Sequence, residues 1–569
     1  MSVRYHALAT DYDGTLATAA RVGAETVAAL TRLRASGRRL VLVTGRIFSD
    51  LAQVFPEHAL FDVVVAENGG VSCRPGAAER LLAEAPSPAL AKALRARGVP
   101  FDQGRVVIAT REPHDVTVLE VIRELGLELD VIFNKGAVMV LPSGVNKRTG
   151  LEAALAELGL TAHEVVALGD AENDHTLLAG AELGVAVENA LPALKERADL
   201  VTRGASGAGV EEVIAGLLAD DLAGLDPPRH RVALGEGAAG ALSVSPAGTR
   251  LLVAGTSGSG KSTFASGVLE KLVEKGYQVC LVDPEGDFEG FQGLTPLGSA
   301  ERTPSVEEVV ALLAEPGISP AVSLLGLPLR DRPRFLTELW PKLQQLRARS
   351  GRPHWLVVDE AHHMFPRAFD SSAALPRDPG GLLLVTVHPD RLEPEVLRTV
   401  NAAVAVGEGA AATLSAFFRS AGLPGGGPAE TQAPEQALLW TARSGETVAF
   451  RPAQPRAAHQ RHRRKYASGD VHEKAFRFRG PDGRLDLRAQ NLELFLQLAD
   501  GVDDETWRFH LENGDYSRWF REAIKDEELA RDAAEVERSA GGDPRDTRKR
   551  LREAVERRYV VEDAGAVAR

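Results

Sequence analysis

The sequence predicts an α/β protein in three parts: a Rossmann-like core with an inserted α+β cap, a second α/β domain, and a small, mostly helical C-terminal domain. Two observations predict the α/β parts. Short apolar runs typical of buried strands end in acidic or glycine-rich strings, and helical segments follow them. A third observation sets apart the last hundred or so residues, which concentrate large aromatic side chains and charged helical segments.

The 569 residues predict three or four domains. We expect the parts to span residues 1–222 (with a cap at about 84–143), 223–455 and 456–569. A Gly/Ser/Ala turn region at 203–209 and the helix-breaking Pro227-Pro228 pair mark the first boundary. Residues 456–465 hold five Lys/Arg, two His and no acid, which predicts a basic linker.

Two acidic strings in the first part each follow a short apolar run. Asp11 and Asp13 follow the first run, and Asp170 and Asp174 follow the run at 165–168. Carboxylates at the ends of adjacent parallel strands can hold a hard divalent cation and neutralise a phosphate ester. Acidic residues also favour turns after strands, which explains one string but not the pair. The two strings therefore predict a phosphoryl-transfer site.

Further segments complete a known pattern. A strand at 41–43 ends in Thr44-Gly45, a Gly-Gly stretch occupies 66–70, and Lys147 precedes a helical run. In this order the segments resemble the haloacid dehalogenase superfamily, specifically its Cof-like, sugar-phosphatase-like branch. The resemblance covers roughly the first 215 residues.

The resemblance implies a role for each matching residue. Asp11 would be the nucleophile that forms an aspartyl-phosphate, and Asp13 would be the general acid/base. Thr44 and Lys147 would hold the transferring phosphoryl group. The substrate would be a small phosphorylated metabolite.

The same resemblance implies a magnesium site and several orienting groups. Mg²⁺ would be held by Asp170 and Asp174, with an Asp11 oxygen and the Asp13 backbone carbonyl. The residues implied in orienting the site or substrate are Gly45, Asn68 and Asn173.

The region between Gly70 and Lys147 predicts the cap. We expect strands at 105–109, 131–133 and 137–141, and a helix at 116–125. A cap excludes water and selects the substrate. The same strands could equally be plain core.

A strand at 251–254 leads into a string that fits G-x-x-x-x-G-K-[ST]. Such a loop cradles phosphates, its lysine reaches the β/γ oxygens and its hydroxyl ligates magnesium. The string predicts ATP as a ligand and these binding residues: Gly255, Gly258, Gly260, Lys261, Ser262 and Thr263.

A second strand, at 355–358, ends in Asp359 and Glu360. With the segment at 281–288, these residues resemble the HerA/FtsK-like ATPases over roughly residues 230–455. The resemblance implies that Asp359 holds the metal through water and that Glu360 polarises the attacking water. His388 stands where that family commonly carries a glutamine sensor, a departure that bears on γ-phosphate sensing.

Global properties limit the partners. The net charge of −13 does not favour nucleic acid, and no apolar run approaches the ~20 residues of a membrane helix. Cys73 and Cys280 lie in different predicted domains, which excludes a disulfide framework and fits a reducing cytoplasm. The C-terminal aromatics predict a small hydrophobic core, a mini-core. The C-terminal helical domain is also a candidate for binding a protein partner.

The leading interpretation is a magnesium-dependent phosphatase fused to an ATP-binding and ATP-hydrolysing domain. One alternative is a bifunctional kinase/phosphatase, against which Glu360 argues because an acid there favours hydrolysis. A second alternative is a nucleotide-gated switch or assembly scaffold with phosphatase output. Comparing ATP turnover with ATP binding separates the three.

Overall fold

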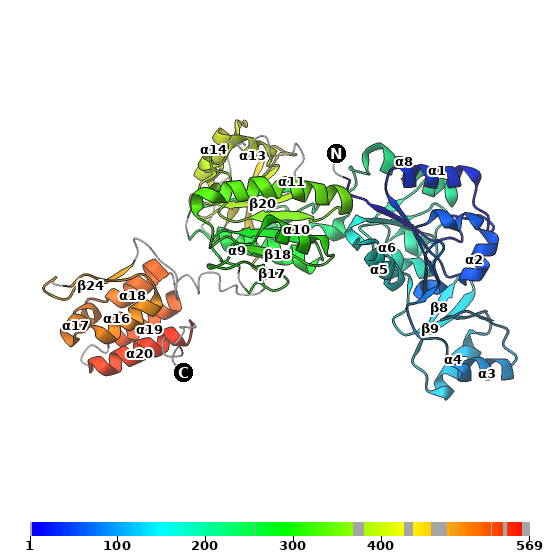
Figure 1. Ribbon diagram of the computed structural model, residues 1–569, viewed down its shortest axis with the longest axis horizontal. Coiled ribbons are helices and arrows are strands. Elements are labelled where there is room, and N and C mark those ends of the chain that lie inside the picture. Colours follow the sequence, from blue (N-terminus) through cyan, green and yellow to red (C-terminus); the bar gives the residue numbers. More distant parts are fainter. Residues whose placement is uncertain are drawn as a thin grey trace. The chain divides into compact units, whose positions relative to one another are not determined.

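The computed structural model describes residues 3–256, 258–288, 290–367, 380–425, 436–456, 475–483, 485–524, 526–538 and 543–559. They form two compact units, Met1–Pro284 with Gln292–Arg456, and Glu285–Phe291 with Ala457–Arg569 (Figure 1). The first unit is α/β and the second mostly helical, so the predicted fold class is confirmed. The predicted boundary near residue 222 stays a prediction, and most of the basic linker lies outside the described residues.

The phosphatase-like core of the first unit contains an eight-stranded sheet in the order β12-β11-β10-β1-β2-β3-β4-β5. Its strands are β1 Ala7–Thr10, β2 Arg39–Val43, β3 Val63–Ala66, β4 Val71–Cys73, β5 Arg80–Leu81, β10 Val165–Gly169, β11 Leu183–Ala186 and β12 Leu200–Val201. β1 pairs in parallel with both β10 and β2. The loops that leave the carboxyl ends of these three strands therefore start side by side.

Helices flank this sheet: α1 Ala24–Ala35, α2 Phe48–Val54, α5 Lys147–Leu158, α6 His175–Ala179, α7 Pro192–Lys195 and α8 Gly207–Asp220. α1 packs against α8. Asn146 caps α5, because its side chain accepts hydrogen bonds from the backbone N–H groups of Arg148 and Thr149. This cap fixes Lys147 as the first residue of the helix, where its side chain is fully buried.

The cap is a four-stranded antiparallel sheet with two helices. Its elements are α3 Pro88–Ala96, β6 Asp102–Gln103, β7 Ile108–Arg111, α4 Asp115–Leu125, β8 Leu129–Asn134 and β9 Ala137–Pro142. The helix predicted at 116–125 and the strands predicted at 131–133 and 137–141 are confirmed. The strand predicted at 105–109 is wrong at its start, because the backbone N–H groups of Arg105 to Val107 donate to the Glu67 carboxylate and not to a neighbouring strand.

The remainder of the first unit contains an eleven-stranded sheet in the order β14-β13-β23-β22-β21-β15-β20-β19-β16-β18-β17. Its strands are β13 Val232–Gly237, β14 Gly240–Val244, β15 Arg250–Ala254, β16 Val279–Asp283, β17 Thr295–Leu297, β18 Pro320–Ser323, β19 Trp355–Val358, β20 Gly381–Thr386, β21 Ala402–Val406, β22 Ala437–Thr441 and β23 Thr447–Pro452. The helices are α9 Lys261–Glu274, α10 Val306–Ala314, α11 Arg332–Ser350, α12 Ala361–Met364, α13 Pro394–Thr399 and α14 Ala410–Ala421. The predicted strands at 251–254 and 355–358 are β15 and β19, with β20 between them in parallel pairing.

The two sheets of the first unit contact each other through residues that precede their strands. His163 comes just before β10, and its Nε2 atom lies 2.9 Å from the carbonyl oxygen of Lys275. Its ring also stacks on Tyr277, with ring centroids 3.9 Å apart. His354 comes just before β19, and its Nε2 atom lies 2.6 Å from Glu164 Oε1. Polar contacts at strand starts therefore join the two parts.

The second unit contains the hairpin strands β24 Phe476–Phe478 and β25 Leu487–Ala489, the helices α16 Leu492–Gly501, α17 Asp504–Glu512, α18 Asp515–Trp519, α19 Glu527–Arg538 and α20 Pro544–Glu556, and a π-helical turn Phe520–Ile524. Trp507, Tyr516 and Phe520 are fully buried in its core. The predicted aromatic mini-core is confirmed.

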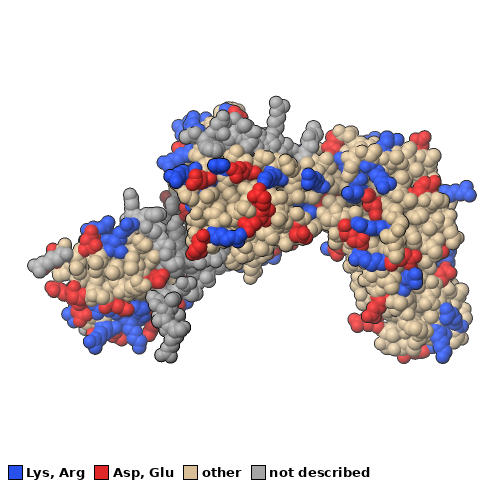
Figure 2. Space-filling model, viewed as in Figure 1, with Lys and Arg blue, Asp and Glu red and all other residues tan. Residues whose placement is uncertain are grey.

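Other global predictions are tested in part. Both cysteines are buried and unpaired, so neither forms a disulfide. Within the described residues, no helix combines the length and the apolar character needed to cross a membrane. On the face shown in Figure 2, acidic and basic side chains are interspersed over the first unit.

Candidate functional site

Three buried carboxylates meet at the carboxyl edge of the first sheet. Oxygens of Asp11, Asp170 and Asp174 all lie within 4.8 Å of one another. Asp11 follows β1, and the other two follow β10. Gly14 lets the first loop approach, because its φ of +85° favours glycine and a Cβ there would overlap the Asp170 carboxylate. The acidic residues of both predicted strings are thus brought together, except for the Asp13 side chain.

Lys147 joins two of these carboxylates. Its ammonium donates to Asp11 Oδ1 and to Asp174 Oδ1, at 2.5 Å in each case. Burial raises the pKa of Asp11, and although Lys147 opposes this rise, the neighbouring Asp174 adds to it. Burial disfavours the charged form of Lys147, but the two carboxylates raise its pKa overall. Lys147 therefore stays charged and offsets part of the negative charge.

The donor set fits a hard divalent cation such as Mg²⁺. All three side chains offer oxygen ligands and all are buried. The negative charge of the three carboxylates exceeds the single positive charge of the buried Lys147 ammonium. Asp174 Oδ2 is oriented by the backbone N–H groups of Asp170 and Ala171, at 2.9 and 3.0 Å. Thr15 Oγ1 donates to Asp170 Oδ1 at 3.0 Å. Such outer partners hold ligand oxygens in place before a cation arrives.

Asp13 is turned toward Arg46. The guanidinium donates from Nε and from its terminal nitrogen to the two Asp13 oxygens, at 2.6 and 2.7 Å. The Arg46 backbone N–H also donates to Thr44 Oγ1 at 3.1 Å. Sequence reasoning missed Arg46, although it directly follows Thr44-Gly45. The bidentate pair fixes where the predicted general acid/base points.

The cap contributes a second residue that sequence reasoning missed. Lys135, in the turn between β8 and β9, forms an ion pair with Asp170. Its backbone adopts a φ of +48°, and the Asn-Lys-Gly string indicates the turn but not its contact with Asp170. Gly45 also faces the cap, because a Cβ there would lie 3.2 Å from Met139 Sδ. The cap therefore reaches the carboxylate cluster.

Asn68 and Asn173 form a pair beside the site. Asn173 Nδ2 donates to Asn68 Oδ1 at 3.0 Å, and the Asn68 backbone N–H donates to the Thr44 carbonyl at 2.9 Å. The neighbouring Glu67 is 1% exposed and accepts three backbone hydrogen bonds from the start of the β7 segment. The 66–70 stretch thus ties the cap to the core, a role that sequence reasoning did not assign.

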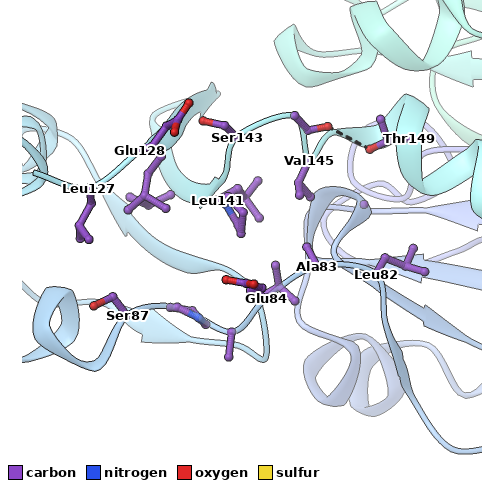
Figure 3. Close-up of a pocket in the computed structure, with 18 of the residues that line it drawn as sticks. Leu82, Ala83, Glu84, Ser87, Leu127, Glu128, Leu141, Ser143, Val145 and Thr149 are labelled. Carbon is purple, nitrogen blue, oxygen red and sulfur yellow. Dashed lines mark hydrogen bonds between the residues drawn. The ribbon is translucent and has the colours of Figure 1, made fainter.

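A cavity of about 710 Å³ lies where the cap joins the core (Figure 3). Both connecting segments line it, including Glu84 and Ser87 on one side and Ser143 and Val145 on the other. None of the predicted catalytic or metal residues lines this cavity. The cavity is therefore separate from the carboxylate cluster.

The predicted phosphate-binding loop connects β15 to α9. Gly258 and Gly260 adopt φ values of +80° and +90°, and α9 begins at Lys261. A Cβ at Gly255 would lie 2.6 Å from the backbone carbonyl oxygen of Val406, so this position also requires glycine. Ser262 is half-buried and Thr263 exposed in the first turn of the helix, and Ser257 lies outside the described residues.

The acidic pair after β19 faces this loop. Lys261 Nζ lies 3.8 Å from Glu360 Oε1, and Asp359 is buried at the end of the strand. His362 Nδ1 lies 3.5 Å from Glu360 Oε2 and 3.1 Å from Thr386 Oγ1. The His388 ring packs edge-on against His362, with centroids 5.3 Å apart. His362 thus contacts the predicted catalytic glutamate, a contact that sequence reasoning did not anticipate.

Known families match two segments of the chain. Residues 8–86 and 131–214 match the family described as haloacid dehalogenase-like hydrolase. Residues 242–331 match the central domain of the helicase HerA. The second match contains the predicted phosphate-binding loop and β16 but ends before β19.

Curated relatives match the first segment. A phosphoglycolate phosphatase of Methanothermobacter thermautotrophicus is 34% identical over 217 residues, which is 96% of that protein and 37% of this chain. One from Halorubrum lacusprofundi is 33% identical over 222 residues, again 96% of its length and 37% of this chain.

Among solved structures, a haloacid dehalogenase-like hydrolase from Bacteroides thetaiotaomicron is 22% identical with a TM-score of 0.33, covering 38% of this chain and all of its own. The identity and coverage of the curated relatives, together with the family match over the segment that carries the carboxylate cluster, establish that this chain belongs to the haloacid dehalogenase-like hydrolases.

Proposed function

We propose that the chain is a magnesium-dependent phosphatase of small phosphorylated metabolites, which acts through an aspartyl-phosphate on Asp11. The observation that carries the proposal is the buried cluster of Asp11, Asp170 and Asp174 around Lys147. Bound Mg²⁺ would neutralise phosphate charge as a Lewis acid. Asp11, Asp170 and Asp174 are the side chains that would hold it, with the Asp13 carbonyl.

The residues of the chain divide the remaining work. An Asp11 oxygen attacks phosphorus, the bond from phosphorus to the leaving oxygen breaks, and Asp13 supplies the proton that the leaving oxygen takes up. Asp13 then removes a proton from water, which attacks the phosphorus and frees Asp11 and inorganic phosphate. Lys147 and Thr44 hold the transferring group. Arg46 holds both Asp13 oxygens in position, and each oxygen keeps a second lone pair for proton transfer.

Phosphoglycolate is the first substrate to test, because several curated relatives are named phosphoglycolate phosphatases. Its small size is compatible with a cap that reaches the cluster through Lys135. Cap side chains select substrates in such an arrangement. A panel of sugar phosphates and nucleotides would define the range.

The decisive experiment compares Asp11→Asn with Asp13→Asn in full-length protein supplied with Mg²⁺ and phosphoglycolate. We expect Asp11→Asn to lower kcat by at least ~10³. Asp13→Asn should instead accumulate phosphate on the Asp11 peptide, detectable by mass spectrometry. Near-normal turnover by Asp11→Asn on every substrate cleaved by the wild type would overturn the proposal.

We also propose that the second α/β part binds and hydrolyses ATP. The supporting observations are the glycine-rich loop with Lys261 at the start of α9, and Glu360 within 3.8 Å of that lysine. His362, in contact with Glu360, would orient this carboxylate. Mg²⁺ would be held by Ser262 directly and by Asp359 through water. Nucleic acid has no part in the proposal.

Lys261→Ala should abolish ATP binding, whereas Glu360→Gln should bind ATP without hydrolysing it. Nucleotide titration and phosphate release, both measured in an Asp11→Asn background, test this without interference from the phosphatase. Normal ATP turnover by Glu360→Gln would contradict the hydrolytic role. Phosphorylation of a second substrate would favour the kinase alternative, and binding without turnover in wild type would favour the switch.

A further inference from the structure

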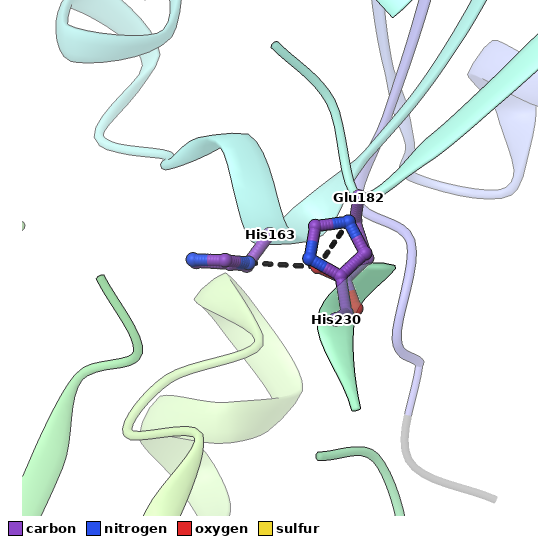
Figure 4. A group of neighbouring side chains, drawn as sticks. All are labelled: His163, Glu182 and His230. Atoms are coloured by element: carbon purple, nitrogen blue, oxygen red, sulfur yellow. Dashed lines mark hydrogen bonds and ion pairs between the residues drawn. The ribbon is translucent and has the colours of Figure 1, made fainter. Parts of the chain in front are cut away.

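A second cluster of potential metal ligands lies near the start of β10, whereas the catalytic carboxylates lie at its carboxyl end. His163, Glu182 and His230 offer ligand atoms that all lie within 4.8 Å of one another (Figure 4). His163 and Glu182 precede β10 and β11, and His230 ends the short helical turn Pro228–His230 in the connection to the second sheet. Lys275 and Tyr277, which follow α9, also contact this cluster.

The hydrogen bonds of His163 favour a cation at one ring nitrogen. Nδ1 lies 2.7 Å from Glu182 Oε2, and Nε2 lies 2.9 Å from the Lys275 carbonyl oxygen. Both neighbours are acceptors, but a neutral imidazole has only one N–H to donate. If Nε2–H donates to Lys275, the Nδ1 lone pair faces the carboxylate. This contact is then satisfied either by a second proton on the ring or by a metal ion bound to both atoms. For a tetrahedral ion, Nδ1 and Oε2 would move apart from 2.7 Å to about 3.3 Å.

The other two groups are suitably placed to share that ion. His230 Nε2 lies 3.7 Å from Glu182 Oε2 and makes no hydrogen bond among the described residues. Glu182 is 2% exposed, and Arg4 donates to its Oε1 at 2.7 Å. The Tyr277 hydroxyl lies 3.1 Å from both Glu182 oxygens. Oε2 therefore faces both histidines, while Arg4 holds the opposite oxygen.

We propose that His163 Nδ1, His230 Nε2 and Glu182 Oε2 bind a first-row transition ion of the Zn²⁺ class. Two imidazoles and one carboxylate suit such an ion better than Mg²⁺, which prefers oxygen alone. The Lys275 carbonyl would be the outer partner that metal-bound histidines usually have. A cavity of about 100 Å³ beside His163 and Glu182 has room for a water as the fourth ligand.

Such an ion would link three separate segments of the first unit. Two ligands belong to the phosphatase core, one belongs to the connecting segment, and the outer partner follows α9, the helix of the phosphate-binding loop. The free energy of metal binding is gained only when these segments lie together, so the ion would stabilise the junction between them. The site would be structural, and it does not depend on the proposed phosphatase or ATPase activity.

The experiment uses full-length protein stripped of metal and then held in excess Mg²⁺, which occupies the oxygen site. Co²⁺ is the probe, because a four-coordinate site with nitrogen ligands absorbs visible light far more strongly than an octahedral oxygen site. We expect one equivalent of Co²⁺ to produce this absorption, and Zn²⁺ to displace it. His163→Gln and His230→Gln should each weaken binding at least ~100-fold.

His354→Gln is the matched control. His354 lies in the same junction, with its ring 5.3 Å from that of His163, but Glu164 and the Gln278 N–H engage its two nitrogens. The His354→Gln variant should therefore keep the visible absorption of bound Co²⁺. Absence of the Co²⁺ signal in wild type, or its retention in both ligand variants, would overturn the proposal and leave a charged cluster. X-ray absorption of Zn²⁺-loaded wild type needs no variant: two imidazoles support the site, and an oxygen-only shell overturns it.

Discussion

Replacing Glu67 by glutamine should loosen the attachment of the cap to the phosphatase core. Glu67 Oε2 accepts from the backbone N–H groups of Val106 and Val107 at 2.7 and 3.0 Å, and Oε1 accepts from that of Arg105 at 3.0 Å. A glutamine keeps one oxygen and places an NH₂ group where a second acceptor is needed. The change therefore removes at least one contact and sets donor against donor.

The size of the effect follows from these contacts. Hydrogen bonds to a charged group contribute about 1.5–3 kcal/mol each, so losing one or two in this buried setting should cost about 3 kcal/mol locally. That cost corresponds to roughly 100-fold faster amide exchange where local opening limits exchange. The amides of Arg105 to Val107 should show this acceleration, because the new NH₂ group faces either the Arg105 amide or those of Val106 and Val107.

Hydrogen exchange read by mass spectrometry over the 100–110 peptide measures this directly, and kcat/KM with phosphoglycolate reports the functional consequence. Glu79→Gln is the matched control, since Glu79 pairs with Arg105 at 3.1 Å on the exposed side of the same segment. Such an exposed pair should contribute no more than ~1 kcal/mol. Equal exchange in the two variants, or unchanged exchange in Glu67→Gln, would refute the anchoring role.

Three further outcomes follow from the contacts described. Lys147→Met leaves the buried carboxylates of Asp11 and Asp174 without a counter-charge. It should lower the free energy of unfolding by about 3–5 kcal/mol without Mg²⁺ and by less with Mg²⁺. Equal shifts of the melting temperature in both conditions would contradict this. Arg46→Ala should lower kcat by up to about 100-fold by misplacing Asp13, which steady-state kinetics would test. Burial alone would raise the pKa of Glu182, but His163 and its other partners hold that pKa at about 2. Up to ~3 kcal/mol of folding stability is therefore lost as pH falls from about 4.5 to about 2. The urea midpoint of Glu182→Gln should vary less across this window than that of the wild type.

Features fixed by local sequence were predictable. The strands before Asp11 and Asp170 end where their apolar runs end, and Gly258 and Gly260 of the predicted phosphate-binding loop occur where positive φ is required. Parallel pairing of adjacent strands then brings the two acidic strings together, as the sequence predicted. Local signals of this kind need no knowledge of distant contacts.

Features that depend on distant contacts were not predictable from one sequence. Lys135 reaches Asp170 only because the cap folds over the core, and nothing in the local pattern of either residue encodes that approach. The displaced start of β7 has the same origin, because Glu67 competes with strand pairing for the same N–H groups. The meeting of His163 with His230 likewise depends on how two sheets pack.

The contacts between the two sheets also determine how the two proposed reaction centres are separated. His163 and Glu182 precede β10 and β11, and Tyr277 and His354 precede β16 and β19, so the two sheets meet at the amino ends of these strands. Both predicted sites lie at the opposite, carboxyl ends of their strands. The five residues of β10 span about 16 Å and the fourteen of α9 about 21 Å. A phosphoryl group could therefore pass between the centres only on a molecule that leaves one and diffuses to the other, and direct hand-over is excluded by distance.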